Sequence, residues 1–221
     1  MTPAEQLTQF LEANKTYLTG LTALNSAVNL ILILAGLIVF TVKWRELKLV
    51  AIGPLQFDRE KISAELVRFQ KSAGGTTATS DRRGIENAVR RATEPAAADL
   101  LAGKTILWVD DHPENNRLGV RALTRLRLHV ESAISTDDAL LHLDSYPDVD
   151  LIISDMGRGE NMRAGYELLD EVRQRGIEVP FVIFAGSDSP ELRKAATDRG
   201  AQLSTNDVGE LLNFITETLS G

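Results

Sequence analysis

The sequence predicts an α/β fold, a doubly wound five-stranded parallel sheet, preceded by a membrane-spanning helix and a helical stalk. From Lys104 onward, short apolar runs alternate with helical patterns, which is typical of repeated βα units. Two of these runs end in aspartate, and a long uncharged segment lies near the start of the chain. We therefore expect three parts: a membrane helix in 1–44, a stalk and linker in 45–102, and the α/β domain in 103–221.

The first part is expected to cross a membrane once. No charged side chain occurs between Lys15 and Lys43, and this gap exceeds the about 20 helical residues that a bilayer core requires. Basic residues follow the apolar stretch, whereas in a cleaved signal peptide they precede it. By the positive-inside rule, the chain after Trp44 faces the cytoplasm and the N-terminus lies outside. The polar face with Asn25 and Asn29 either pairs with a second copy of the helix or lies among lipid head groups.

The second part is expected to be a juxtamembrane stalk followed by a flexible linker. Residues 58–71 carry a narrow apolar stripe that includes Leu66 and Phe69, which suits a coiled coil, packing on a neighbour or a solvated helix. The stripe and the membrane helix are thus candidate contacts of a homo-oligomer. Residues 43–94 hold 11 basic and 7 acidic groups, a balance that favours contact with anionic lipid. Residues 72–80 are small and polar, as in a linker.

The third part shows five βα units, which predict a three-layer doubly wound domain. The expected strands are 104–109, 129–133, 149–154, 180–184 and 201–204. The expected helices are 113–127, 136–145, 164–175, 189–199 and 207–219, with a further short helix at 85–91. The chain has no cysteine, which excludes disulfides and thiolate metal sites, and its net charge of −7 argues against a nucleic-acid partner.

Three aspartates follow two of the expected strands. Asp110 and Asp111 come directly after the first strand, and Asp155 follows the third. Ligands of an open parallel sheet bind just beyond the carboxyl ends of its strands, so these carboxylates should share one crevice. Carboxylates that close repel one another, and a divalent cation such as Mg²⁺ is the natural way to hold them. For Asp111 alone, capping of the next helix is an open alternative.

The sequence around these aspartates carries a set of motifs. The strongest are Trp108-Val109-Asp110-Asp111 and Ile152-Ile153-Ser154-Asp155-Met156, supported by Ala164-Gly165-Tyr166-Glu167-Leu168-Leu169, Val179-Pro180-Phe181-Val182-Ile183 and Arg199-Gly200-Ala201. In these motifs the chain resembles the receiver domain of bacterial two-component response regulators. The resemblance implies a flavodoxin-like fold in which Asp155 accepts a phosphoryl group from a histidine kinase. It also implies Mg²⁺ bound by Asp111 directly, by Asp110 through water, by Asp155 and by the carbonyl of Gly157.

Two positions depart from the receiver pattern. Ala185 stands where receivers have a hydroxyl that contacts the phosphoryl group, and Ser187 is a nearby substitute. Asn206 lies in the stretch where receivers have a lysine that ion-pairs with that group. In the loop after Asp155, Arg158 either contacts the phosphoryl group or is solvated.

These features support two functions. The first is a membrane-anchored, atypical response-regulator receiver in phosphorelay signal transduction, with no enzymatic activity beyond the self-phosphorylation typical of receivers. It would be a phosphoprotein of the bacterial inner membrane with its receiver in the cytoplasm. The second is a phosphorylation-independent interaction or scaffold module tethered to the membrane. A metal-dependent hydrolase is a third, less favoured class, because only Asp155 offers a nucleophile. Expected partners are a histidine kinase or another signalling protein, the membrane and a second copy of the chain.

Overall fold

The computed structural model describes residues 59–74, 79–146, 148–186 and 189–221. The expected membrane helix, the start of the stalk and Ser187 lie outside these residues. Among the helices that are described, none combines the length and the apolar character needed to cross a membrane. All described residues belong to one compact unit, Gly53–Gly221.

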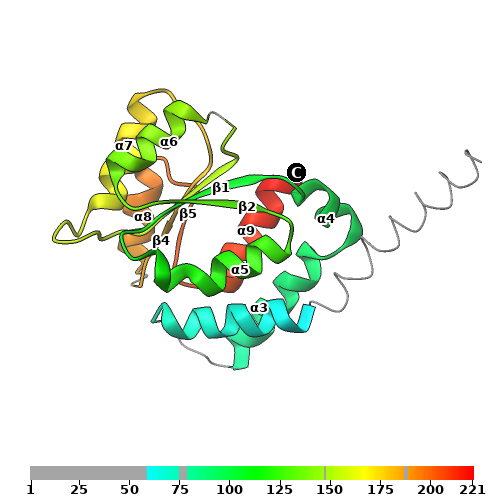
Figure 1. Ribbon diagram of the computed structural model, residues 1–221. Coiled ribbons are helices and arrows are strands. Elements are labelled where there is room, and N and C mark those ends of the chain that lie inside the picture. Colours follow the sequence, from blue (N-terminus) through cyan, green and yellow to red (C-terminus); the bar gives the residue numbers. More distant parts are fainter. Residues whose placement is uncertain (1–58, 75–78, 147, 187–188) are drawn as a thin grey trace, which may run out of the picture. The chain divides into compact units, whose positions relative to one another are not determined.

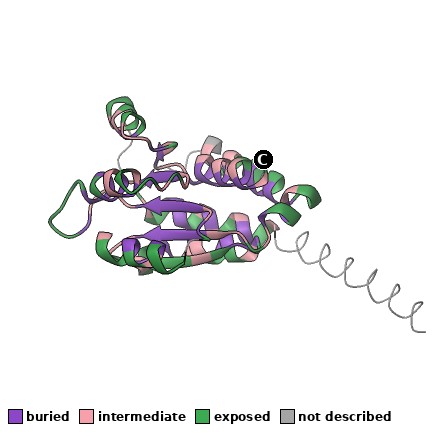
Figure 2. Ribbon diagram, turned by 90° about the horizontal axis from the view of Figure 1, so that it is seen from above, coloured by how far each residue is buried: buried purple, intermediate pink, exposed green. Residues whose placement is uncertain are grey.

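The core of the unit is a five-stranded parallel sheet with the strand order β2-β1-β3-β4-β5 (Figure 1). The strands are Thr105–Val109 (β1), His129–Ala133 (β2), Leu151–Ser154 (β3), Phe181–Phe184 (β4) and Leu203–Thr205 (β5). Each predicted strand is confirmed to within two residues at either end. β1, β3 and β4 are almost entirely buried, because helices cover both faces of the sheet (Figure 2). In the register of β1 and β3, Val109 lies opposite Ser154. The aspartates that follow these two residues therefore leave the same edge of the sheet.

The helices after the strands also match their predicted positions to within two residues, except that the first begins at Arg117, four residues later than predicted. They are Arg117–Arg125 (α5), Thr136–Ser145 (α6), Ala164–Gln174 (α7), Pro190–Asp198 (α8) and Val208–Ser220 (α9), and a 3-10 turn, Pro113–Asn116, precedes α5. Ser135 caps α6, since its hydroxyl accepts a hydrogen bond from the amide of Asp138 at 3.0 Å. Buried residues of α6, α7 and α8 pack on one face of the sheet, and those of α5 and α9 pack on the other.

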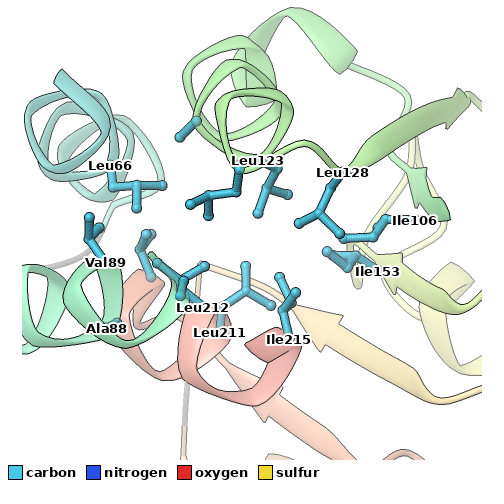
Figure 3. Close-up of a cluster of buried hydrophobic side chains, with 14 of the residues drawn as sticks. Leu66, Ala88, Val89, Ile106, Leu123, Leu128, Ile153, Leu211, Leu212 and Ile215 are labelled. Carbon is cyan, nitrogen blue, oxygen red and sulfur yellow. The ribbon is translucent and has the colours of Figure 1, made fainter. Parts of the chain in front are cut away.

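Three helices precede the sheet and cover the face that carries α5 and α9. They are the helix over residues 59–72 (cyan in Figure 1), Thr79–Ala92 (α3) and Pro95–Leu101 (α4). Figure 3 shows Leu66 of the first helix and Val89 of α3 converging with Leu123 of α5 and Leu212 of α9 in one hydrophobic cluster. The structure thus differs from the separate stalk expected for the described part of 45–102. The apolar stripe of this segment covers the chain's own core.

The sequence could not indicate this packing because a helical stripe shows which face is apolar and leaves its partner open. Ile62, Leu66 and Phe69 are each 3% exposed or less, so the whole stripe is buried within the unit. The short helix predicted at 85–91 is part of the longer α3 for the same reason: its apolar residues are buried on α9.

Candidate functional site

The structure brings the three aspartates together at the carboxyl edge of the sheet. Asp110 and Asp111 lie just after β1, and Asp155 lies just after β3. One carboxylate oxygen of each lies within 4.8 Å of the other two, so a single cation could contact all three. This proximity follows from the parallel register of the two strands, since the amide of Asp155 donates to the carbonyl of Val109 at 2.9 Å.

The aspartates line a pocket of about 320 Å³. Its wall includes the predicted ligand Gly157 and the predicted departure Ala185, which offers only a methyl group. Three further lining residues come from the end of the helix over 59–72 and the turn after it: Phe69, Ser72 and Ala73. These residues were not predicted as part of the site, because no local motif connects them to aspartates that follow much later in the chain.

Hydrogen bonds orient two of the carboxylates. Asp110 accepts from the amide of His112 and from the side-chain amide of Asn116, both at 2.7 Å. Asp111 accepts from the amide of Gly159 at 2.7 Å, and this bond joins the β1 and β3 loops. The first position before the 3-10 turn is His112, which makes no side-chain capping bond, so the structure does not support the capping alternative for Asp111. Asn116 is a site residue that sequence reasoning missed, since an asparagine in a helix start is common.

Glycine at position 165 brings α7 close to the site. A Cβ atom there would lie 2.7 Å from the carbonyl oxygen of Asp155, which is too close for any side chain. The first turn of α7 therefore packs directly against the loop that carries Asp155. Gly165 lies in one of the motifs identified in the sequence, but its contact with Asp155 appears only in the fold.

Arg158 is buried, with an exposed fraction of 7%, so the alternative in which it is solvated is wrong. Its guanidinium donates to the hydroxyls of Ser154 at 2.8 Å and Thr136 at 2.9 Å, and to the carbonyls of Ala164 at 2.8 Å and Asp155 at 3.3 Å. These contacts fasten the β3–α7 loop to α6 and to the start of α7. Arg158 does not line the pocket, so its geometry favours a structural role over contact with a phosphoryl group.

At Asn206, in the stretch where receivers have the lysine, the backbone contacts the helix over 59–72. The carbonyl of Asn206 accepts from the side-chain amide of Gln70 at 2.8 Å, and the oxygen of that amide accepts from the backbone of Val208 at 2.6 Å. Gln70 is buried, with an exposed fraction of 3%. The lysines of 103–221 are engaged elsewhere: Lys104 pairs with Asp150 at 2.8 Å, and Lys194 pairs with Asp198 at 2.6 Å.

The carboxyl of Asp155 is harder to ionise than an ordinary aspartate. Burial, and next the negative charge of Asp110, raise its pKa from 3.8 to about 6. Hydrogen bonding to the amide of Met156 and the positive charge of Arg158 oppose this rise. The negative charges of Asp110 and Asp111 thus add to burial in opposing ionisation of Asp155.

This raised pKa predicts a pH-dependent stability when divalent cations are removed. The folded state resists ionisation of Asp155, so the penalty is fully present above pH 6 and fades toward pH 3.8. The pKa difference corresponds to about 3 kcal/mol, which solvent screening at this partly buried site reduces to about 1–2 kcal/mol. We therefore expect Asp155→Asn to raise the free energy of unfolding by that amount at pH 7 and by less than half as much at pH 4.5.

Urea denaturation in the presence of a chelator measures this effect. Asp148→Asn is the control, because Asp148 is exposed and lies away from the pocket, and it should change stability by a few tenths of a kcal/mol at either pH. An Asp155→Asn variant no more stable than the wild type at pH 7 contradicts the prediction.

Known proteins match the part of the chain that forms the sheet and carries the three aspartates. The family model for the response regulator receiver domain matches residues 106–204. Two-component response regulator ORR13 of Oryza sativa subsp. japonica is 33% identical over 123 residues, which are 52% of this chain and 100% of that protein. ORR8 of Oryza sativa subsp. indica is 34% identical over 104 residues, 46% of this chain and 84% of that protein. A solved structure of the Vibrio cholerae chemotaxis protein CheY4 is 24% identical, covers 53% of this chain and 100% of its own, and has a TM-score of 0.47. The chain therefore belongs to the response regulator receiver domain family of two-component signalling.

Proposed function

We propose that Asp155 accepts a phosphoryl group from a histidine kinase, with Mg²⁺ held by Asp110, Asp111, Asp155 and the carbonyl of Gly157. The observation that carries this proposal is the cluster of three carboxylates within 4.8 Å in one pocket. The residues present fit the ion, because Mg²⁺ prefers oxygen ligands and the charge of Asp110 already opposes ionisation of Asp155. When bound, Mg²⁺ neutralises the negative charge that gathers where a carboxylate meets a phosphoryl group.

The proposed transfer uses the side chain of Asp155 as the nucleophile. A carboxylate oxygen forms a bond to the phosphorus of a phosphohistidine, the phosphorus–nitrogen bond breaks, and the imidazole leaves with a proton from water. The carboxyl must be ionised to attack. A bound cation would favour the attack by lowering the pKa of Asp155 below about 6. Receiver domains are in general not enzymes, and the role we propose for this chain is that of an acceptor in a phosphorelay.

We further propose that the helix over 59–72 responds to the phosphoryl group in place of the hydroxyl and the lysine that receivers use. Neither Ala185 nor Asn206 can supply the hydroxyl or the lysine that receivers use. The pocket wall instead includes Phe69, Ser72 and Ala73, and the adjacent Gln70 holds the start of α9. A phosphoryl group on Asp155 would therefore meet this helix, which leads back toward the N-terminal part of the chain.

The test is covalent labelling of the full chain by a small phosphodonor such as acetyl phosphate. We expect one phosphoryl adduct in Mg²⁺, located on Asp155 by peptide mass spectrometry and absent from Asp155→Asn. Asp111→Asn should label about 100-fold more slowly, as when one electrostatic stabiliser of a transition state is removed. The control Asp148→Asn should label as the wild type does.

A chain that never acquires an adduct on Asp155 favours the second function, a phosphorylation-independent interaction or scaffold module. Two observations favour it. Ala185 offers only a methyl group where receivers have a hydroxyl, and the carbonyl of Asn206, in the stretch where receivers have a lysine, accepts a hydrogen bond from Gln70. In that case Asp155→Asn should leave the cellular function intact.

We also propose that residues 1–44 anchor the protein in a membrane, with the receiver on the cytoplasmic side. The support is the uncharged stretch between Lys15 and Lys43 and the basic residues after it. The bacterial inner membrane and a homo-oligomer formed through this helix and the stalk belong to the same proposal. Alkaline carbonate extraction tests the anchor: release of the full chain from membranes would rule it out.

A further inference from the structure

A groove of about 650 Å³ lies between the helix over 59–72 and α3, and it is distinct from the acidic pocket. Most of its charged lining residues are basic, and they come from both helices: Arg59, Arg68, Lys71, Arg82 and Arg90, against the acidic Glu60 and Glu86. Its apolar lining residues are Ala64, Val67 and Val89. Basic side chains therefore surround a partly apolar floor.

Much of this positive charge is not neutralised by carboxylates. Arg82 pairs with Glu86 at 3.0 Å, whereas Arg59 donates to the hydroxyl and the carbonyl of Thr93, which carry no charge. Across the described ranges, neither Arg68 nor Lys71 pairs with a carboxylate.

Arg90 completes the set, since its hydrogen bond goes to the neutral side chain of Asn87 at 3.3 Å. The positive charge is also local, because residues 104–221 hold 12 basic and 21 acidic groups. An excess of unpaired cations on two facing helices favours an anion from outside the unit.

We propose that this groove binds a phosphate-bearing anionic ligand, such as a phospholipid head group or a soluble phosphate compound. Arg68 and Arg90 offer planar forks that match phosphate oxygens in pairs, and Lys71 adds a mobile point charge. Val67 and Val89 provide apolar contact for the carbon-bearing part of such a ligand. The volume lies within the range of small-molecule sites in proteins.

A lipid head group is the source that agrees with the proposed anchor. Only residues 45–58 separate Trp44, at the expected membrane surface, from the start of the helix over 59–72. The C-terminal end of the same helix also lines the acidic pocket through Phe69 and Ser72. A ligand in the groove and a phosphoryl group on Asp155 would thus act on one helix.

The experiment uses the full chain in neutral detergent micelles and measures amide hydrogen exchange in peptides from 59–74 and 79–92. The probes are dihexanoyl phosphatidic acid, dihexanoyl phosphatidylcholine and inorganic pyrophosphate. We expect phosphatidic acid to slow exchange in both peptides. In the double variant Arg68→Ala/Lys71→Ala, its half-saturating concentration should rise about 25-fold, since each basic residue contributes about a fivefold gain at an anionic surface.

The matched control is Arg83→Ala/Arg117→Ala, which removes the same charge from exposed positions outside the groove. It should shift half-saturation by less than about twofold. Protection by pyrophosphate at equal or lower concentration supports the groove and identifies a soluble phosphate ligand. Protection by neither anionic probe, or an equal loss in the control variant, overturns the proposal. Labelling of Asp155 is measured separately, so failure of the groove and failure of the phosphoacceptor are distinguishable.

Discussion

Phe69→Ala is expected to destabilise the protein by about 3–5 kcal/mol, the usual cost of truncating a buried aromatic ring. The ring is 1% exposed and lies between the first helix and the sheet. It stacks on Phe184 at the end of β4, with 5.5 Å between ring centroids, and meets Trp108 of β1 edge-on at 5.7 Å. Its removal leaves a cavity beside the acidic pocket that neighbouring rings cannot fill.

A glycine in α5 shows how closely this ring fits. A Cβ atom at Gly119 would lie 2.9 Å from the ring of Phe69 and 3.1 Å from that of Trp108. Glycine within a helix costs about 0.5–1 kcal/mol relative to alanine. Alanine at position 119 would avoid that cost, but its methyl group would collide with the ring of Phe69.

Equilibrium urea denaturation of the full chain measures the effect of Phe69→Ala. Phe69→Leu should cost less, because leucine refills most of the cavity. Tyr146→Ala is the aromatic control at a side chain that is 63% exposed, and it should change stability by about 0.5 kcal/mol or less. If Phe69→Ala were as mild as this control, the helix over 59–72 would be a separate stalk, as its composition first indicated.

Arg158→Met is expected to cost about 2–4 kcal/mol. Methionine can fill the space of the arginine stem, but it leaves the buried hydroxyl of Ser154, the partly buried hydroxyl of Thr136 and the carbonyl of Ala164 without the donors that Arg158 supplies. Hydrogen bonds to charged groups contribute about 1.5–3 kcal/mol each in favourable cases, and an unsatisfied buried partner adds its own penalty. The β3–α7 loop would lose its attachment to Thr136 in α6.

A second readout separates this role from simple packing. The charge of Arg158 lowers the pKa of Asp155, so its removal should raise that pKa above about 6 in a carbon-detected NMR titration without divalent cations. The control is Arg163→Met, in the same loop but exposed, where only a contact with the ring of Tyr166 at 5.9 Å is lost. Its cost should stay below about 1 kcal/mol. Equal costs in the two variants would contradict the role assigned to Arg158.

Much of the receiver sheet was predictable from local sequence. Strands buried on both faces leave short continuous apolar runs, so 151–154 and 181–184 were recognisable without their neighbours. Gly176 and Gly200 end their helices with φ angles of 71° and 95°, a conformation that glycine adopts without strain. The meeting of Asp110, Asp111 and Asp155 was predictable too, because parallel strands end at a common edge.

The sequence by itself therefore determined the strands, most boundaries of the helices that follow them and the edge at which three carboxylates meet, since each depends on residues close together in the chain. Only the tertiary structure decided where the apolar stripe with Phe69 packs and that Gln70 lies beside Asn206. It also decided that Arg158 is buried and contacts α6 and the start of α7. The physical reason is distance along the chain: Gln70 and Asn206 are 136 residues apart. Periodicity identifies an apolar face, but the surface that covers it is chosen by the packing of the whole unit.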